Sequence, residues 1–238
     1  MLCKWEELPA FMRNEAVRPY YERLERRRAM LFVKRTFDFI MASWMLVVFS
    51  PIFLVLAIWI RLDSAGPVFY RQERVTQYGR VFRIYKFRTM VQDADQKGSL
   101  VTTSGDARIT KVGKKLRGCR LDELPQLINI WKGEMSFVGT RPEVIKYVRR
   151  YTAEMYATLL LPAGVTSEAS VRFKDEDQII SEGTREGRSI DEVYVKDVLP
   201  EKMLWNLKGI WEFSIGGEIK TMIETIQVVT KVNENDNL

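Results

Sequence analysis

Residues 37–60 read FDFIMASWMLVVFSPIFLVLAIWI, the one long apolar run in a chain of 238 residues. Only Asp38, Ser43 and Ser50 interrupt this run. Because a helix rises about 1.5 Å per residue, a run of this length can cross a hydrocarbon core of about 30 Å. The run therefore predicts a helix that enters a membrane.

Two features leave the path of this helix open. Pro51 removes a backbone hydrogen bond and predicts a kink, and the Ser50 hydroxyl can satisfy a carbonyl that the kink frees. Basic residues, which favour the cytoplasmic side, flank both ends. They are Arg26, Arg27, Arg28, Lys34 and Arg35 before the run and Arg61, Arg71, Arg74, Arg80 and Arg83 after it. A re-entrant helix that leaves on the face it entered and a kinked single span are both consistent with this pattern.

The composition limits which side chains can catalyse a reaction and which partners the chain can bind. The chain has 37 Lys and Arg against 31 Asp and Glu, a formal charge of +6, which suits an anionic partner such as a phosphorylated ligand, a membrane surface or nucleic acid. It has no histidine, which excludes histidine-based triads and the usual zinc ligand. Cys3 and Cys119 match no ligand spacing and are interpreted as unpaired thiols. Any catalysis therefore depends on carboxylates, Lys, Tyr or an oxygen-bound metal.

The remaining elements are expected from periodicity and from turn residues. The expected helices cover residues 10–36, 108–118, 122–131 and 143–158, followed by two amphipathic helices separated by Gly216-Gly217. Two extended segments within 66–90 are expected on either side of a turn at Gln77-Tyr78-Gly79. Loops are expected at 91–107 and around Pro162 and Gly164, a charged surface at 172–192, and a disordered tail at 231–238.

The chemical signal lies between Arg108 and Glu143, in RITKVGKKLRGCRLDELPQLINIWKGEMSFVGTRPE. Six basic residues and no acidic one precede the pair Asp122-Glu123. Cations beside a carboxylate pair are what a phosphate-handling site needs, since the carboxylates can act as nucleophile, base or metal ligand. Asp122 is also a candidate helix N-cap, where a carboxylate is favoured in its ionised form. A plain helix cap is the alternative interpretation.

The basic residues also have two interpretations. Lys111, Lys114 and Lys115 fit a solvated helix face or a patch on anionic lipid. Arg117 and Arg141 are better candidates for phosphate binding because a guanidinium binds phosphate in a bidentate way.

Several segments, in order, resemble the bacterial sugar transferase family, the monotopic phosphoglycosyl transferases. They are KRTFDFIMAS (34–43), Ser50-Pro51, GPVFYRQERV (66–75), RIYKFRTM (83–90), RITKVGKKLR (108–117) and LDELPQLINIWKGEMSFVGTRPE (121–143). The resemblance implies a mainly helical α+β fold with a re-entrant helix hairpin bent at Ser50-Pro51, interfacial amphipathic helices and a small β-hairpin. It also implies a bacterial inner-membrane protein with its catalytic domain on the cytoplasmic face.

The resemblance further implies the reaction. Asp122 would attack the β-phosphate of a UDP-sugar, release UMP and form a phosphosugar–aspartyl intermediate. Polyprenyl (undecaprenyl) phosphate would take the phosphosugar in a second, ping-pong step, the first membrane step of exopolysaccharide, capsule or glycoconjugate synthesis. Glu123 would deprotonate or position the acceptor. Magnesium, or manganese, would bind Asp122 and Glu123.

Substrate phosphates are assigned to Arg117, Arg141, Lys86 and Arg88 under the same resemblance. The segment PAGVTSEAS (162–170) departs from the family pattern, with Glu168 as its odd element, so the sugar stays open. The expected division is a basic segment 1–33, the membrane helix 34–61, a catalytic core 62–165, a helical extension 166–230 of undefined role and the tail.

Two other functions are consistent with parts of the sequence. A membrane-anchored scaffold of the same fold without turnover is opposed by the carboxylate pair and the two arginines. A nucleic-acid binder using the interleaved aromatics is opposed by the apolar run, so no nucleic-acid partner is expected. Membrane lipid is an expected partner, and the C-terminal helices offer a surface for a homodimer.

Overall fold

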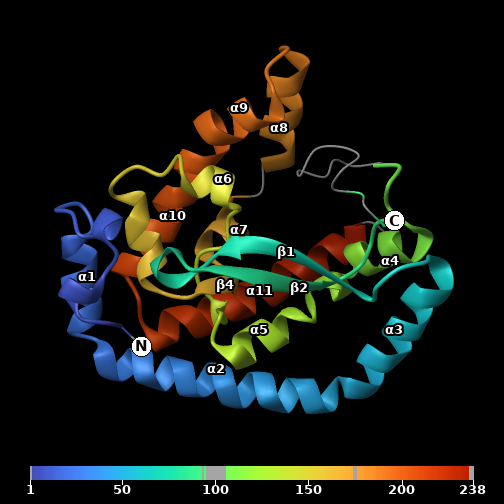
Figure 1. The fold of residues 1–238 in the computed structure, drawn as a ribbon, viewed down its shortest axis with the longest axis horizontal. Coiled ribbons are helices and arrows are strands. Elements are labelled where there is room, and N and C mark those ends of the chain that lie inside the picture. The colour runs from blue at the N-terminus through green and yellow to red at the C-terminus, as the bar shows by residue number, and fades with distance from the viewer. Residues whose placement is uncertain (1, 93, 95–105, 174–175, 236–238) are drawn as a thin grey trace.

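The computed structural model describes residues 2–92, 94, 106–173 and 176–235. Within them the chain is mainly helical, with two two-stranded sheets. This confirms the mainly helical α+β class. In Figure 1 the helices α2 and α3 form a bent arm along the lower edge, and α8 and α9 form the opposite end. The β1–β2 hairpin lies between them.

The apolar run folds as two helices, α2 (Arg28–Val48) and α3 (Ser50–Asp63). The predicted bend at Ser50-Pro51 is confirmed: Pro51 lies in the first turn of α3, and the Ser50 hydroxyl donates to the Val47 carbonyl at 2.8 Å. Among the described residues no single helix is both long and apolar enough to cross a membrane. α2 and α3 meet those criteria only together, as a pair bent by 61°.

One side of this bent pair packs on the protein and the other is exposed. Leu31, Lys34, Asp38 and Ala42 recur at helical spacing on the buried side of α2. Large apolar side chains cover the exposed side. They include Phe32, Val33, Ile40, Trp44 and Val47 on α2 and Leu54, Val55, Ile58 and Leu62 on α3.

The single helix expected over 10–36 is wrong. A 3-10 turn spans Ala10–Met12, α1 spans Arg18–Glu25, and α2 begins at Arg28. The Asn14 side chain accepts from the backbone N–H of Val17 at 3.0 Å and so starts a new turn ahead of α1. Pro19 in the first turn of α1 fits a helix start better than a helix interior.

The predicted hairpin is confirmed. β1 (Phe69–Val75) pairs antiparallel with β2 (Val81–Phe87). The turn between them places Tyr78 at φ 60° and Gly79 at φ 75°. Phe82 and Phe87 are buried in the core, so these two aromatic rings are not available for stacking on a ligand.

The loop expected around Pro162 and Gly164 is partly a strand. β3 (Met135–Val138) and β4 (Ala163–Thr166) pair in parallel. Gly139 and Gly164 permit the close approach, because a Cβ on Gly164 would lie 2.2 Å from the Gly139 nitrogen. A parallel partner 28 residues away gives no local signal, which explains why the sequence pattern missed this pair.

The helices around the predicted site are short. α4 spans Lys111–Gly118 and is capped by Thr110, whose side chain accepts from the Gly113 N–H. α5 spans Gln126–Lys132 and ends at Gly133 with φ 81°. Most of the loop expected at 91–107 lies outside the described residues.

The helix expected over 143–158 is wrong. α6 covers only Ile145–Val148, and a 3-10 segment spans Met155–Leu160. The Thr152 hydroxyl accepts from the Met155 N–H at 3.4 Å and begins a separate helical turn.

The C-terminal part contains α7 (Glu168–Arg172), α8 (Glu176–Arg185), α9 (Ile190–Val193), a π-helical turn Tyr194–Val198, α10 (Leu199–Trp211) and α11 (Ile215–Asn235). Gly216-Gly217 lie in the first turn of α11 instead of separating the last two helices, because Ser214 caps that turn by accepting from the Gly217 N–H. α11 also continues to Asn235, into the segment expected to be disordered, because neither proline nor glycine interrupts residues 218–235. Residues 236–238 lie outside the described ones.

Three clusters of buried apolar residues hold these elements together. The largest joins the N-terminal residues Leu2–Leu24 to α9, α10 and the 3-10 segment. The second lies between α2, β2 and α5, and the third between α3, β2 and α4. The hairpin therefore contacts both arms of the bent helix pair. The five-part division of the chain stays a prediction.

Candidate functional site

The carboxylate pair lies on a short 3-10 turn, Leu121–Glu123, that follows α4. Arg120, at φ 55° and ψ 17°, adopts a left-handed conformation that is uncommon for a residue other than glycine, and it reverses the chain there. Asp122 is not a helix cap, because α5 begins after Pro125 and has no side-chain cap. The pair therefore precedes the helix by a turn.

Glu123 is held by two cations from distant parts of the chain. Its Oε1 accepts from Lys86 Nζ on β2 at 2.8 Å and from Arg141 Nη2, just after β3, at 2.7 Å. Burial opposes ionisation of Glu123, but the charges of Arg141 and Lys86 outweigh it and hold the pKa of this carboxyl well below its usual range. The Glu123 charge in turn raises the pKa of Arg141. The four residues Asp122, Glu123, Lys86 and Arg141 are called the Glu123 cluster below.

Asp122 is in a different environment. Its side chain is buried. Among the described residues none donates a hydrogen bond to its carboxylate or forms an ion pair with it. Burial raises the pKa of Asp122, with Lys86 and Arg117 opposing that shift. The expectation that a helix N-terminus keeps this carboxylate ionised is wrong, because no helix begins there. Cations at a distance oppose the effect of burial on its pKa but do not reverse it.

Arg117 is brought near the pair by α4. Its Nε donates to the Thr89 hydroxyl at 2.9 Å, and its charge acts to lower the pKa of Asp122. The contact is tight, because a Cβ on Gly113 would lie 2.0 Å from the Thr89 carbonyl oxygen. Glycine at this position lets α4 approach the end of the hairpin and present Arg117 toward the carboxylates.

Arg88 is not brought into the Glu123 cluster. Its guanidinium donates to the carbonyl of Ala65 at 2.8 Å and to the carbonyl of Ser64 at 2.6 Å, at the end of α3. Its side chain is buried there, and burial lowers the pKa of Arg88. Phosphate binding by Arg88 therefore stays a prediction, and the observed contacts fix the bent helix pair to the hairpin.

Two residues beside the cluster were missed by the sequence reasoning. Arg74, at the end of β1, donates to the Pro142 carbonyl at 3.2 Å and lies close enough to influence Arg141 and Glu143 electrically. Glu143 is buried behind Arg141 and accepts from the Tyr194 hydroxyl at 2.6 Å. Arg74 is the last residue but one of GPVFYRQERV, and Glu143 ends the longest matching segment. Nothing in the spacing of either segment indicates that these two residues lie close together.

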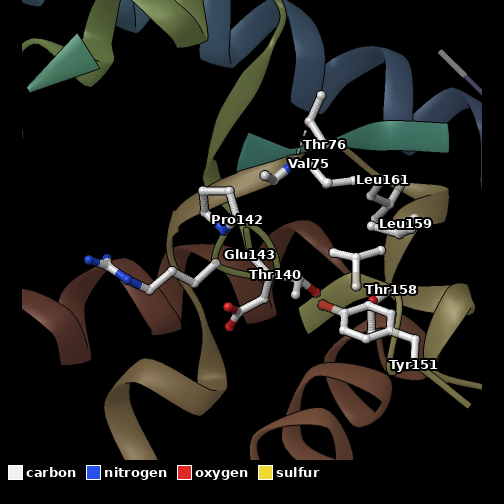
Figure 2. Close-up of a pocket in the computed structure, with 12 residues that line it drawn as sticks. Val75, Thr76, Thr140, Pro142, Glu143, Tyr151, Thr158, Leu159 and Leu161 are labelled. Carbon is white, nitrogen blue, oxygen red and sulfur yellow. Dashed lines mark hydrogen bonds between the residues drawn. The ribbon is translucent and has the colours of Figure 1, made fainter. Parts of the chain in front are cut away.

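A cavity beside the loop that carries Arg141 is too small for a nucleotide sugar. Figure 2 shows it between Thr140, Pro142 and Glu143 on one side and Leu159 and Tyr151 on the other. Its volume of about 10 Å³ is that of a single water molecule. A nucleotide sugar therefore does not bind inside this cavity.

The cluster can take part in holding a divalent cation but cannot enclose one. Among the described residues no group of three or more His, Cys, Asp or Glu side chains forms a metal site. Magnesium often binds through one or two carboxylates plus substrate phosphates. The buried Asp122 carboxylate, which has no cation of its own, and the free second oxygen of Glu123 fit that donor set.

Comparisons with known proteins agree with the motifs. The bacterial sugar transferase family matches residues 29–232. UDP-N-acetylgalactosamine-undecaprenyl-phosphate N-acetylgalactosaminephosphotransferase from Aeromonas hydrophila is 43% identical over 59% of this chain and 34% of its own length. UDP-glucose:undecaprenyl-phosphate glucose-1-phosphate transferase from Escherichia coli is 31% identical over 82% and 39%.

The name of a third relative contains another sugar, galactose. Undecaprenyl-phosphate galactose phosphotransferase from Salmonella typhimurium is 36% identical over 59% of this chain. The alignment covers 32% of that protein, so the chain spans about a third of the length of these three relatives.

Proposed function

This chain belongs to the bacterial sugar transferase family, and from that premise we propose that it transfers a sugar 1-phosphate from a UDP-sugar to polyprenyl (undecaprenyl) phosphate. UMP is the other product. The observation that carries the proposal is the Glu123 cluster, in which a buried, unpaired Asp122 carboxylate lies beside a Glu123 that two cations hold ionised. Such an arrangement combines a nucleophile with charges that neutralise phosphate.

In the first half-reaction a carboxylate oxygen of Asp122 attacks the β-phosphorus of the UDP-sugar. The bond between that phosphorus and the bridging oxygen breaks, and UMP leaves with the electron pair. The product is a phosphosugar joined to Asp122. Because burial raises the pKa of Asp122, the arrival of cations at the site favours the ionised form that attacks.

In the second half-reaction an oxygen of the acceptor phosphate attacks the same phosphorus. The bond to Asp122 breaks, the carboxylate is regenerated, and polyprenyl diphosphosugar forms. Glu123 is poorly suited to take a proton, because Lys86 and Arg141 hold its pKa well below its usual range. Its role in the proposal is therefore to orient Lys86 and Arg141 toward phosphate oxygens.

Asp122 and the free oxygen of Glu123 would hold magnesium, or manganese, together with the diphosphate. When bound, the ion would neutralise phosphate charge and draw electron density from the phosphorus. Arg117, whose charge acts on Asp122, would add a guanidinium to the same oxygens.

The proposed location is the bacterial inner membrane, with the catalytic part on the cytoplasmic face. The exposed apolar side of α2 and α3 would lie in the lipid, entering and leaving one leaflet at the 61° bend. A long isoprenoid acceptor requires the Glu123 cluster to act at the membrane surface. The exposed side chains of Ile219, Ile223 and Ile226 on α11 suit either that surface or a second copy of the chain.

The test is UMP release by purified protein in nanodiscs, assayed with polyprenyl phosphate and a panel of UDP-glucose, UDP-galactose and their N-acetylated amino forms. Asp122→Asn should abolish UMP release and the labelling of the Asp122 peptide by donor carrying a labelled sugar. The matched control is Asp197→Asn. It removes a carboxylate that pairs with Arg188 and that lies far from Asp122 in the sequence, so this variant should release UMP at the wild-type rate. Product accumulation without any labelled Asp122 peptide would refute the two-step route.

A further inference from the structure

A buried polar network connects the C-terminal helices to the loop that carries Arg141. The Glu143 carboxylate is 6% exposed and accepts from the Tyr194 hydroxyl at 2.6 Å. Lys202 Nζ donates to the same hydroxyl oxygen at 3.2 Å and to Glu176 Oε2 at 3.1 Å, and it lies 3.8 Å from Glu143 Oε1. These four residues are called the Glu143 network.

The backbone of residues 139–143 is hydrogen-bonded to the hairpin and to β4. The Val75 N–H donates to the Glu143 carbonyl at 2.9 Å, and the Gly164 N–H donates to the Thr140 carbonyl at 2.9 Å. The side chains of the loop point in two directions from this frame. Arg141 reaches Glu123, while Glu143 reaches into the C-terminal helices.

The burial of Glu143 makes its partners important. An ionised carboxylate away from water is costly unless it is hydrogen-bonded and paired. Tyr194 supplies the hydrogen bond and Lys202 the charge, and both are themselves buried. The segment that carries Tyr194 and Lys202 therefore stabilises the observed position of the Glu143 side chain, and with it the C-terminal end of the 139–143 loop.

We propose that Tyr194 and Lys202 are positioning residues that act through Glu143 to hold Arg141 on Glu123, so that the C-terminal extension completes the site. The catalytic consequence depends on the function proposed above, whereas the positioning of the loop does not. Neither residue contacts the Glu123 cluster directly. Their effect passes through Pro142, the one residue that separates Arg141 from Glu143.

A purely stabilising role is the alternative, and the chain offers a matched control for it. The ring of Tyr147 packs on that of Tyr194 with centroids 4.4 Å apart. The Tyr147 hydroxyl, however, donates to Asp191 at 2.8 Å, whereas Glu143 accepts from Tyr194. Tyr147→Phe therefore removes a hydroxyl from the same pair of rings and leaves the Glu143 network intact.

The experiment compares Tyr194→Phe with Tyr147→Phe in the full chain, using hydrogen–deuterium exchange of residues 139–145 and steady-state kinetics of UMP release. Tyr194→Phe should speed exchange in that peptide by about tenfold, since a hydrogen bond to a buried carboxylate is lost. It should also raise KM for the UDP-sugar by about threefold or more. A smaller folded fraction would lower kcat and leave KM unchanged.

Tyr147→Phe should leave both quantities within about twofold of the wild type. Lys202→Met serves as the second variant if Tyr194→Phe does not fold, and it should act in the same direction. Unchanged exchange in the 139–145 peptide, or equal changes in the Tyr147 control, would overturn the proposal. If the wild type releases no UMP from any donor, the proposed function fails, and the exchange measurement alone still decides whether Tyr194 positions the loop.

Discussion

Replacing Lys86 by methionine tests the electrostatics of the Glu123 cluster. Lys86 Nζ lies 2.8 Å from Glu123 Oε1, and the two side chains are 24% and 13% exposed. At an effective dielectric constant of about 20, two unit charges at this distance attract by about 6 kcal/mol. The buried ammonium also loses hydration, and Arg141 still pairs with Glu123 in the variant, so the net loss in the free energy of unfolding should be about 2 kcal/mol.

The pH dependence identifies the cause. The pKa of Glu123 is depressed in the folded state, so its contribution to stability is fully present above the unfolded pKa of about 4.3 and is lost as the pH falls through the folded pKa. Both proteins then carry a protonated Glu123, which needs no lysine. The difference between wild type and Lys86→Met should therefore shrink as the pH falls from 7 toward 3.

The assay is thermal unfolding in mild detergent at pH 7, 4 and 3. A loss of about 2 kcal/mol corresponds to a decrease in Tm of about 4–8 °C for a chain of this size. Lys132→Met is the matched control, because Lys132 is exposed and contacts Tyr85 but none of the described carboxylates. A decrease no larger than that of the control, or one that grows on acidification, would refute the reasoning.

Three further predictions concern the packing and the site. Gly164→Ala should lower the free energy of unfolding by about 3 kcal/mol in chemical denaturation, because the new Cβ would meet the Gly139 backbone. Its control, Gly209→Ala, places a Cβ in open space on α10 and should raise the free energy of unfolding by about 0.5–1 kcal/mol. Arg88→Met should lower Tm and leave KM for the UDP-sugar unchanged, whereas Arg117→Met should raise that KM by about tenfold. If Arg88→Met raised KM and Arg117→Met did not, Arg88 and not Arg117 would bind the phosphates. Chelation by EDTA should stop UMP release and added Mg²⁺ should restore it; full activity in EDTA would exclude the proposed metal role.

The elements that the sequence predicted correctly are those with local signals. The β1–β2 hairpin is marked by two aromatic stretches around a turn, and α4 by apolar residues at helical spacing after a capping threonine. The bend between α2 and α3 is marked by Ser50-Pro51. In each case the residues that cause the feature lie within it, so the pattern alone is sufficient.

The elements that were missed depend on distant partners. The pattern of residues 143–158 predicts one helix, yet the helical backbone ends with α6. Tyr147 and Tyr151 are instead buried in the largest core cluster, beside the C-terminal helices. β4 forms because it pairs with β3, and because Gly139 and Gly164 have no side chains to prevent that close approach. Tertiary contacts override local propensity at both places.

The candidate site shows the same limit at the level of single side chains. Lys86 and Arg88 are two residues apart, so the alternation of a strand puts them on the same face. β2 ends at Phe87, however, and Arg88 turns to the carbonyls after α3 while Lys86 stays on Glu123. Asp122 and Glu123 are likewise adjacent, yet only Glu123 meets the two cations, so burial raises the pKa of one carboxyl and ion pairing lowers that of the other. The sequence names both carboxylates, but their separate chemical roles arise only where β2, the 3-10 turn and the 139–143 loop meet.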